Sequence, residues 1–315
     1  MDALLDVLCC PADQGPLGRE PGWLTCADCA RRYPYDGQLV SFLSEDELTG
    51  VDREEQQSRD AEAAWYDTIF ADYTNIVEVP ATVGPLGDPT GILLDHGCGT
   101  GRITTYLAEK LGQPVIALDY SIEALRLLLP RIAGQDVLAV HADGRHLPFR
   151  NRAFVGITSA EVYEHFRAPD RKRVLKELNR VLRPGGLLSI SSLNYSLPFK
   201  LWKLKGNAGA KEGERMFGSD FYYVRQTPRE FRSELQEVFS VLDLVGIRNI
   251  PARSLSVGVG KVFGSKAGDR FLGFMTRHGY RVDRLIERTP LGPLLGFFLL
   301  AKVTKRSATP KGRGR

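Results

Sequence analysis

The chain has 315 residues, of which 43% are hydrophobic and 25% are charged, and its formal net charge at pH 7 is +4. These values are typical of a soluble globular protein with one large domain and an appendage. The apolar stretch 294–301 is far shorter than the roughly 20 residues of a membrane-spanning helix, and we expect it to form a buried strand. The N-terminus lacks the basic flank of a secretory signal, so we expect a cytoplasmic protein without a membrane span.

Four of the five cysteines fall within the first 29 residues, a clustering that indicates metal binding before disulfides. Cys26 and Cys29 have the two-residue gap of a zinc knuckle. The other half of the expected four-ligand zinc site is irregular, because Asp13 stands where a second cysteine is expected after Cys10. Aspartate is a weaker zinc ligand than thiolate, and Cys9 could replace it after a local shift. We therefore predict a zinc site of Cys10, Asp13, Cys26 and Cys29, with a metal-free ribbon as the alternative.

Residues 1–43 resemble the small zinc-ribbon activator of tRNA and translation-factor methyltransferases. The resemblance rests on the cysteine pair and on Cys10-Pro11, Gly15-Pro16-Leu17, Tyr33-Pro34 and Asp36-Gly37. It implies a small β-rich module, and some members of that family lose ligands while keeping the fold. An apolar nucleus for this module is available in Trp23, Leu24, Tyr33, Tyr35, Leu39 and Phe42.

The apolar segment 92–94 ends in Asp95 and runs into three closely spaced glycines, Gly97, Gly99 and Gly101. Glycines permit positive φ and lack Cβ atoms, so a flat ligand can lie against the backbone where a strand turns into a helix. The dinucleotide pattern needs a further glycine where Arg102 stands, and Asp95 would repel a pyrophosphate. S-adenosylmethionine has no phosphate, and an acid attracts its cationic end. The loop therefore predicts an S-adenosylmethionine site.

Two further predicted strands end in acids at the same sheet edge. Residues 115–118 lead to Asp119 and Tyr120, about 20 residues after the loop, where a strand-end acid binds ribose hydroxyls. Ser121 is placed to cap the helix that follows. Residues 137–141 lead to Asp143 and Gly144, and this acid is placed to accept a hydrogen bond from an adenine amino group.

Residues 91–195 resemble a class I S-adenosylmethionine-dependent methyltransferase of the ubiquinone and menaquinone biosynthesis-like group. Beyond the loop, the matching motifs are Leu147-Pro148-Phe149, Glu161-Val162-Tyr163-Glu164-His165 and Leu182-Arg183-Pro184-Gly185-Gly186. The resemblance implies an α/β fold, a Rossmann-like seven-stranded sheet with helices on both faces and an antiparallel last strand. It also implies that Asp95, Gly97, Gly99 and Gly101 contact the methionine end of the cofactor, Asp119 the ribose and Asp143 the adenine. We predict further cofactor-binding residues at Tyr120, Gly144 and Glu161. Val155 departs from the family pattern, which usually has aspartate there.

The pattern along the chain divides it into four parts. These are a ribbon (1–43), a linker and lid helix (44–90), a methyltransferase domain (91–303) and a basic disordered tail (304–315). In the family the helix near 61–72 lies over the cofactor, so Tyr66 is a candidate lid residue, with packing on the sheet as the alternative. We expect a linker at 80–90, a helix beginning near Thr227, and strands near 238–245 and 294–303. The tail could instead contact nucleic acid or anionic lipid.

The insertion at 196–230 breaks the alternation of strands and helices. It carries apolar and aromatic side chains at Leu197, Phe199, Leu201, Trp202, Phe221, Tyr222 and Tyr223, interleaved with lysines. Because it follows the fifth strand, we predict a substrate lid with apolar walls, the alternative being a surface helix pair.

Methyl transfer from a sulfonium is an in-line displacement, which needs a base only when the nucleophile carries a proton. By position, His165 is the candidate base, with a structural role as the alternative. Tyr195 and Asn194 could orient an acceptor. Alternatively, Glu161, Glu164 and His165 could hold a divalent ion.

Three functions remain open at this point. An S-adenosylmethionine-dependent methyltransferase acting on a small apolar or aromatic molecule, by O- or N-methylation, is favoured by the insertion and the weak net charge. The ribbon and basic tail suggest instead an RNA or protein methyltransferase, and a non-enzymatic cofactor-binding scaffold is the third hypothesis. The sequence after the fourth strand, Ser159-Ala160-Glu161-Val162, lacks the Asn/Asp-Pro-Pro-aromatic motif of enzymes that methylate exocyclic base amines.

Overall fold

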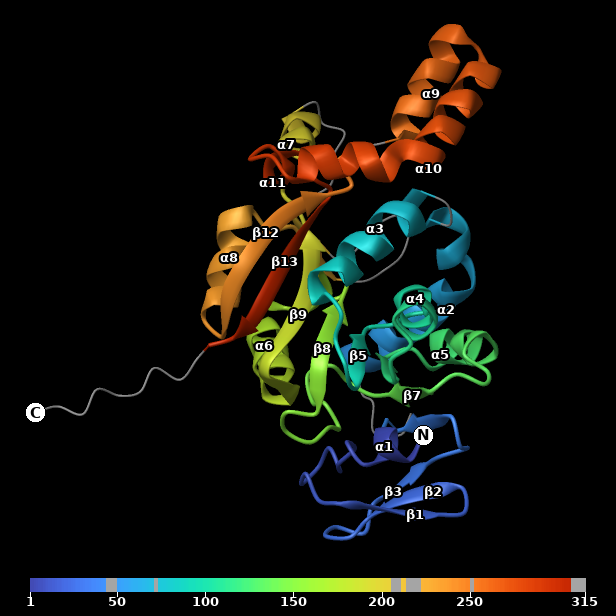
Figure 1. The fold of residues 1–315 in the computed structure, drawn as a ribbon, viewed down its shortest axis with the longest axis vertical. Helices are drawn as coiled ribbons and strands as arrows, with labels where there is room; N and C mark the ends of the chain where they lie inside the picture. The colour runs from blue at the N-terminus through green and yellow to red at the C-terminus, as the bar shows by residue number, and fades with distance from the viewer. Residues whose placement is uncertain (44–49, 71–72, 205–210, 214–221, 250–251, 307–315) are drawn as a thin grey trace, which may run out of the picture.

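An eight-stranded sheet forms the centre of the molecule (Figure 1). The computed structural model describes residues 1–43, 50–70, 73–204, 211–213, 222–249 and 252–306. From edge to edge, the strands are β12 (Phe239–Ile247), β13 (Phe298–Lys305), β9 (Leu182–Leu193), β8 (Phe154–Ser159), β5 (Leu93–His96), β6 (Val115–Asp119), β7 (Val137–His141) and β4 (Leu39–Ser41). β13 is antiparallel to both neighbours, and the strands from β9 to β4 are parallel. This is the predicted Rossmann-like sheet with one additional strand.

Helices cover both faces of the sheet, and the strand residues alternate accordingly. Leu93, Val115 and Val137 pack in one apolar cluster with three helices, α3 (Tyr73–Val83), α4 (Arg102–Leu111) and α5 (Ile122–Leu128). The next residue of each strand packs in a second cluster, with α6 (Ala168–Val181) and α8 (Pro228–Gln236). Parallel strands present their carboxyl ends at one edge, so the segments that follow β5, β6 and β7 meet there.

The N-terminal module supplies the eighth strand. Its helix α1 (Asp2–Leu5) precedes a three-stranded antiparallel sheet of β1 (Leu17–Glu20), β2 (Trp23–Cys26) and β3 (Arg32–Pro34). The next strand, β4, leaves this small sheet and pairs in parallel with β7. Leu8 forms a β-bridge with Phe149, and the amide of Cys9 donates to the carbonyl of Pro148 at 2.9 Å. The module and the large sheet therefore share one apolar core.

The predicted linker at 80–90 is partly wrong, because helix α3 runs through Pro80 to Val83 and a 3-10 turn follows at Gly84–Leu86. The predicted lid helix is the longer α2 (Gly50–Phe70), which precedes α3. Its aromatic side chains, including that of Tyr66, lie outside the described residues.

After β9 the chain forms α7 (Leu197–Leu204), the short paired strands β10 (Glu212–Gly213) and β11 (Tyr223–Val224), and then α8. Thr227 caps α8 as predicted, in a reciprocal capping box with Glu230. Phe221 and the side chain of Trp202 lie outside the described residues. Between β12 and β13 the chain forms two long helices, α9 (Ala252–Phe263) and α10 (Ser265–Glu287), which no motif in the sequence analysis predicted.

The predicted strand at 294–303 begins later than expected, at Phe298, because the short helix α11 (Gly292–Leu295) precedes it. Residues 307–315 of the predicted tail lie outside the described residues. None of the helices in the described part of the chain is both long and apolar enough to span a bilayer.

Candidate active site

The glycine loop follows β5 with all three glycines at positive φ, 73° for Gly97, 53° for Gly99 and 93° for Gly101. A Cβ atom at Gly97 would lie 2.1 Å from Val162, and one at Gly101 would lie 2.1 Å from Leu128. A Cβ atom at Gly99 would meet no atom within 4 Å. Two of the glycines thus allow the loop to pack on its neighbours, whereas Gly99 faces open space. This surface fits a flat ligand laid against the backbone.

Asp95 lies beneath this loop, 1% exposed. Its carboxylate accepts hydrogen bonds from the hydroxyls of Thr104 at 2.7 Å and Thr158 at 2.9 Å, which joins α4 to β8. Burial raises the pKa of Asp95 to about 6. The carboxylate therefore joins β8 to α4, the helix that begins directly after the loop, and its attraction for a cationic ligand stays a prediction.

Asp119 ends β6 and lies directly against the loop. One carboxylate oxygen accepts the Gly99 amide at 2.7 Å, and the other accepts the Ser121 amide at 2.8 Å. The hydroxyl of Ser121 accepts from the amide of Ala124, so this residue caps α5 as predicted. A carboxylate has about four acceptor positions, so Asp119 keeps capacity for the hydroxyls of a ribose.

Helix α2 is anchored over the ends of β6 and β7. The amide of Gln56 donates to the carbonyl of Tyr120 at 3.3 Å and hydrogen-bonds with His141 at 3.0 Å. Asp60 accepts from the hydroxyl of Ser121. His141 also hydrogen-bonds through Nδ1 with Ser41 of β4, at 2.8 Å. No local sequence pattern predicted these contacts, although the polar His141 at the end of an apolar strand was a signal for them.

Asp143 follows β7, and both of its oxygens accept from Arg145, the shortest contact being 2.6 Å. The neighbouring Gly144 lies against His96, since a Cβ atom there would be 2.4 Å from the imidazole Nε2. His96 hydrogen-bonds with Ser159 at 3.0 Å, and burial lowers its pKa to about 4, so the ring is neutral at pH 7. A glycine at position 144 therefore lets the chain after β7 approach the end of β5.

Three glutamates form an acidic group, because the charge of Glu161 contributes to raising the pKa values of both Glu78 and Glu164. Glu161 has a positive φ of 58° and an ion pair with Arg102 at 3.2 Å. Glu78 of α3 is 2% exposed and lies 3.7 Å from Arg248, and burial raises its pKa well above the usual range. Glu164 is 1% exposed, one of its oxygens accepts no hydrogen bond, and burial raises its pKa to about 8. A partly protonated carboxyl group at neutral pH is a candidate for proton transfer.

His165 is held by the backbone, because its Nδ1 hydrogen-bonds with the carbonyl of Tyr222 at 2.9 Å. Burial and the charge of Arg59 lower its pKa well below the usual value. In the described part of the chain, Glu161, Glu164 and His165 do not bring their ligand atoms together as a metal site would. The hypothesis of a divalent ion at this position is therefore not supported, and the carboxylate of Glu161 is directed to Arg102 instead.

The predicted metal ligands of the ribbon do come together, with the four ligand atoms of Cys10, Asp13, Cys26 and Cys29 all within 4.8 Å of one another. The Cys10 and Cys29 sulfurs are 3.7 Å apart, and the Cys26 sulfur lies 3.4 Å from an Asp13 oxygen. Tetrahedral zinc with bonds of about 2.3 Å to sulfur and 2.0 Å to oxygen requires edges of about 3.8 and 3.5 Å. The four residues thus fit zinc, whereas Cys9 contacts the large domain and stays outside the cluster.

Comparisons with known proteins agree with this arrangement. Residues 94–190 match the model of the methyltransferase domain family, and residues 2–34 match that of Trm112p-like proteins. Demethylmenaquinone methyltransferases are similar to this chain. The protein from Lactobacillus johnsonii is 31% identical over 54% of this chain and 72% of its own length. The protein from Staphylococcus aureus strain MRSA252 is 30% identical over 53% of this chain and 71% of its own length.

The chain belongs to the class I S-adenosylmethionine-dependent methyltransferases. The methyltransferase therefore uses S-adenosylmethionine as its methyl donor, which confirms the cofactor predicted from the loop and the expectation of an enzyme over a scaffold. The cofactor-binding role of each individual residue stays a prediction.

Solved structures show the same fold. One is the complex of the Haloferax volcanii Trm112 methyltransferase activator with a putative methyltransferase, with a TM-score of 0.54 and 18% identity over 80% of this chain and 97% of that chain. Another is the Burkholderia thailandensis 1,6-didemethyltoxoflavin-N1-methyltransferase, with a TM-score of 0.50 and 17% identity over 89% of this chain and 98% of that chain.

Replacing Asp119 with alanine should weaken S-adenosylmethionine binding by about 1–3 kcal/mol, because a charge-assisted contact to the ribose is lost. Isothermal titration calorimetry measures this change. The Glu109→Ala variant, at an exposed position of α4, should bind as the wild type does. Unchanged affinity in Asp119→Ala would contradict the assigned role, as would equal wild-type affinities for NAD and S-adenosylmethionine.

The purified methyltransferase should contain one zinc ion per chain, and the Cys26→Ser variant should lose it. Elemental analysis measures the metal content, and a melting curve reports the accompanying loss of stability. Cys9→Ser is the matched control, because Cys9 is buried nearby but lies outside the cluster. Zinc-free protein with an unchanged melting curve would show that the ribbon folds without metal.

Replacing Glu164 with glutamine should change how stability depends on pH. Because the pKa of Glu164 is raised by burial, the wild type loses stability as the pH rises from about 4.5 towards 8. Glutamine does not ionise, so the variant should gain about 3 kcal/mol relative to the wild type between pH 5 and pH 8. Urea denaturation at both pH values measures the difference. Parallel profiles, as expected for the exposed control Glu109→Gln, would rule out a buried titrating carboxyl group.

Proposed function

We propose that this methyltransferase acts on a small aromatic or apolar molecule that carries an ionisable group. The observation that carries the proposal is a group of aromatic rings around a buried cation beyond the end of β9. The Tyr195 and Phe199 rings lie 5.6 Å apart between centroids. Arg225 is 6% exposed, and its guanidinium carbon lies 4.1 Å from the centre of the Phe199 ring and 5.8 Å from that of Tyr223.

Lysines border the same rings, with the ammonium groups of Lys200 and Lys211 at 5.1 and 5.6 Å from the centre of the Tyr195 ring. Flat rings favour stacking with a flat acceptor, and the surrounding cations stabilise negative charge on an acceptor oxygen. These features support O-methylation of an aromatic hydroxyl. Tyr195 is predicted from sequence to orient the acceptor. Together with Phe199, Tyr223 and Arg225 it forms what we call the acceptor wall.

The proposed cofactor site is the sheet edge formed by Gly99, Asp119 and Asp143. Helix α2 covers this site. When bound, S-adenosylmethionine supplies a methyl group activated by its sulfonium. The protein's contribution is to align the acceptor with that methyl group and to exclude water.

We also assign the proton acceptor to Glu164 in preference to His165. Burial raises the pKa of Glu164 to about 8, so a fraction of this carboxyl group is ionised and able to accept a proton at neutral pH, whereas the pKa of His165 lies well below its usual value. The charges of Arg59 and Arg225 act against the effect of burial and lower the pKa of Glu164. In this scheme Glu164 takes the hydroxyl proton, Arg225 stabilises the resulting oxyanion, and His165 positions the chain through the carbonyl of Tyr222.

The ribbon is proposed to support the cofactor edge within the same chain. Its strand β4 pairs with β7, and Ser41 reaches His141, which in turn contacts α2 and the carbonyl of Tyr120. This face of the ribbon is occupied by the methyltransferase domain, which does not favour its use as a substrate-binding surface for RNA or protein.

Incubation with methyl-tritiated S-adenosylmethionine tests the acceptor class. Label should enter the organic extract of a cell lysate and not total RNA or protein. With the labelled extract as substrate, Arg225→Gln should lower the rate by roughly 10–100-fold, because oxyanion stabilisation is lost, while cofactor affinity stays unchanged. Arg229→Gln, at an exposed position of α8, is the matched control. Incorporation into RNA at low enzyme concentration would refute the small-molecule assignment.

A further inference from the structure

A two-helix hairpin, α9 and α10, projects from the sheet between β12 and β13 (Figure 1). Ile247 of β12 pairs with Phe298 of β13, which pairs with Leu193 at the carboxyl end of β9. The hairpin therefore leaves the sheet at the edge where the glycine loop and the acceptor wall lie. Helix α10 contacts α3 and β12, whereas the extensive contacts of α9 are with α10 alone among the described elements.

Small residues form the seam between the two helices. A Cβ atom at Gly268 of α10 would lie 2.6 Å from the carbonyl oxygen of Ser256 and 3.1 Å from the Cα of Gly260, both in α9. In soluble proteins a helix pair normally buries its large apolar side chains in such a seam. Seams of small residues are typical of helices in contact with lipid, where the large apolar side chains face outwards.

Large apolar side chains are correspondingly exposed on the outside of the hairpin. At its tip, Val262 is 72% exposed and Phe263 is 75% exposed, next to the turn at Gly264. Further apolar residues with high exposure on the two helices are Leu255, Val257, Phe274 and Leu285. Neighbouring apolar side chains with this exposure indicate an interaction surface.

The same surface is strongly basic. Residues 255–281 contain one acid, Asp269, and five cations, all exposed: Lys261, Lys266, Arg270, Arg277 and Arg281. Apolar side chains bordered by lysine and arginine are the pattern of helices that lie in the interface of an anionic bilayer. Two copies of such a basic surface repel each other, which disfavours a dimer through this surface. A polynucleotide would explain the cations but not the exposed apolar side chains of Val262 and Phe263 between them.

We propose that the α9–α10 hairpin docks on an anionic phospholipid surface, with Val262 and Phe263 inserted at the head-group boundary and the surrounding cations bound to lipid phosphates. Because the hairpin leaves the sheet at the carboxyl end of β9, docking in this way turns that edge of the sheet towards the bilayer. That the bilayer supplies the methyl acceptor rests on the proposed function, whereas the docking itself does not.

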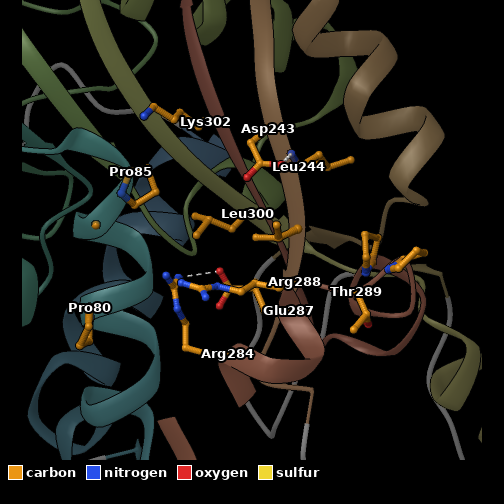
Figure 2. A pocket seen from close by; sticks show the side chains of 14 residues that line it. Pro80, Pro85, Asp243, Leu244, Arg284, Glu287, Arg288, Thr289, Leu300 and Lys302 are labelled. Carbon is orange, nitrogen blue, oxygen red and sulfur yellow. Dashed lines mark hydrogen bonds and ion pairs between the residues drawn. The ribbon is translucent and has the colours of Figure 1, made fainter. Parts of the chain in front are cut away.

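A pocket elsewhere in the molecule gives no basis for assigning a ligand. A pocket of about 620 Å³ lies between α3, β12, β13 and the end of α10, and Figure 2 shows side chains that line it. Its charged lining mixes acids and bases, and Arg284 pairs with Glu287 at 2.7 Å. This lining selects no ligand class.

Vesicle flotation with the full chain tests the proposal. The wild type should float with vesicles of phosphatidylcholine and phosphatidylglycerol, and at least tenfold less protein should float with phosphatidylcholine alone. The double variant Val262→Ser/Phe263→Ser and the triple variant Lys261→Gln/Lys266→Gln/Arg270→Gln should each lower partitioning onto anionic vesicles at least tenfold. The C-terminal tail is unchanged in every variant, so its contribution is constant.

Two matched controls complete the experiment. Leu242→Ser removes an apolar side chain that is 55% exposed on β12, and Lys110→Gln/Lys176→Gln/Arg229→Gln removes three exposed cations from α4, α6 and α8. Both should float as the wild type does. The proposal is overturned if the wild type does not float with anionic vesicles, or if the double and triple hairpin variants float as their controls do. It is also overturned if these hairpin variants abolish a dimer or an RNA complex with no change in flotation. Flotation is independent of turnover, so an error in the proposed acceptor would leave this result unaffected.

Discussion

The parallel pairing of β5, β6 and β7 is the constraint on which the other features depend. It brings the segments after three strands to one edge, so residues far apart in sequence share a small volume. The Asp119 carboxylate then joins two of these segments by accepting the amides of Gly99 and Ser121. Because this edge is buried, carboxylates near it hold protons more strongly, as the pKa values of about 6 for Asp95 and about 8 for Glu164 show. The same packing thus forms the cofactor edge and sets the acid–base properties near it.

Local chemistry was sufficient to predict many parts of this structure. Ser121 and Thr227 cap helices because their hydroxyls reach nearby amides, and the ribbon ligands converge because two short turns carry them. The glycine spacing predicted the loop, since positive φ is needed there whatever the rest of the chain does. These features depend on a few neighbouring residues, which sequence patterns report directly.

Features that depend on distant contacts escaped prediction. The pairing of β4 with β7 involves only a three-residue strand, and its partner lies about a hundred positions away. In the α9–α10 hairpin, Gly268 packs against Ser256 and Gly260, a contact that no local sequence pattern reports. Glu164 was considered only as a metal ligand, since its altered proton affinity arises from burial by elements that no local pattern reveals. Pro80 lies inside α3, where tertiary packing overcomes its unfavourable effect on the helix.

The covalent link between the ribbon and the methyltransferase domain has a consequence for how their association behaves. The solved Haloferax volcanii structure is a complex of an activator with a putative methyltransferase, whereas here one polypeptide carries both types of domain. Linkage through a short segment corresponds to an effective local concentration in the millimolar range. Docking of β4 on the sheet is therefore insensitive to dilution and to the supply of a separate subunit.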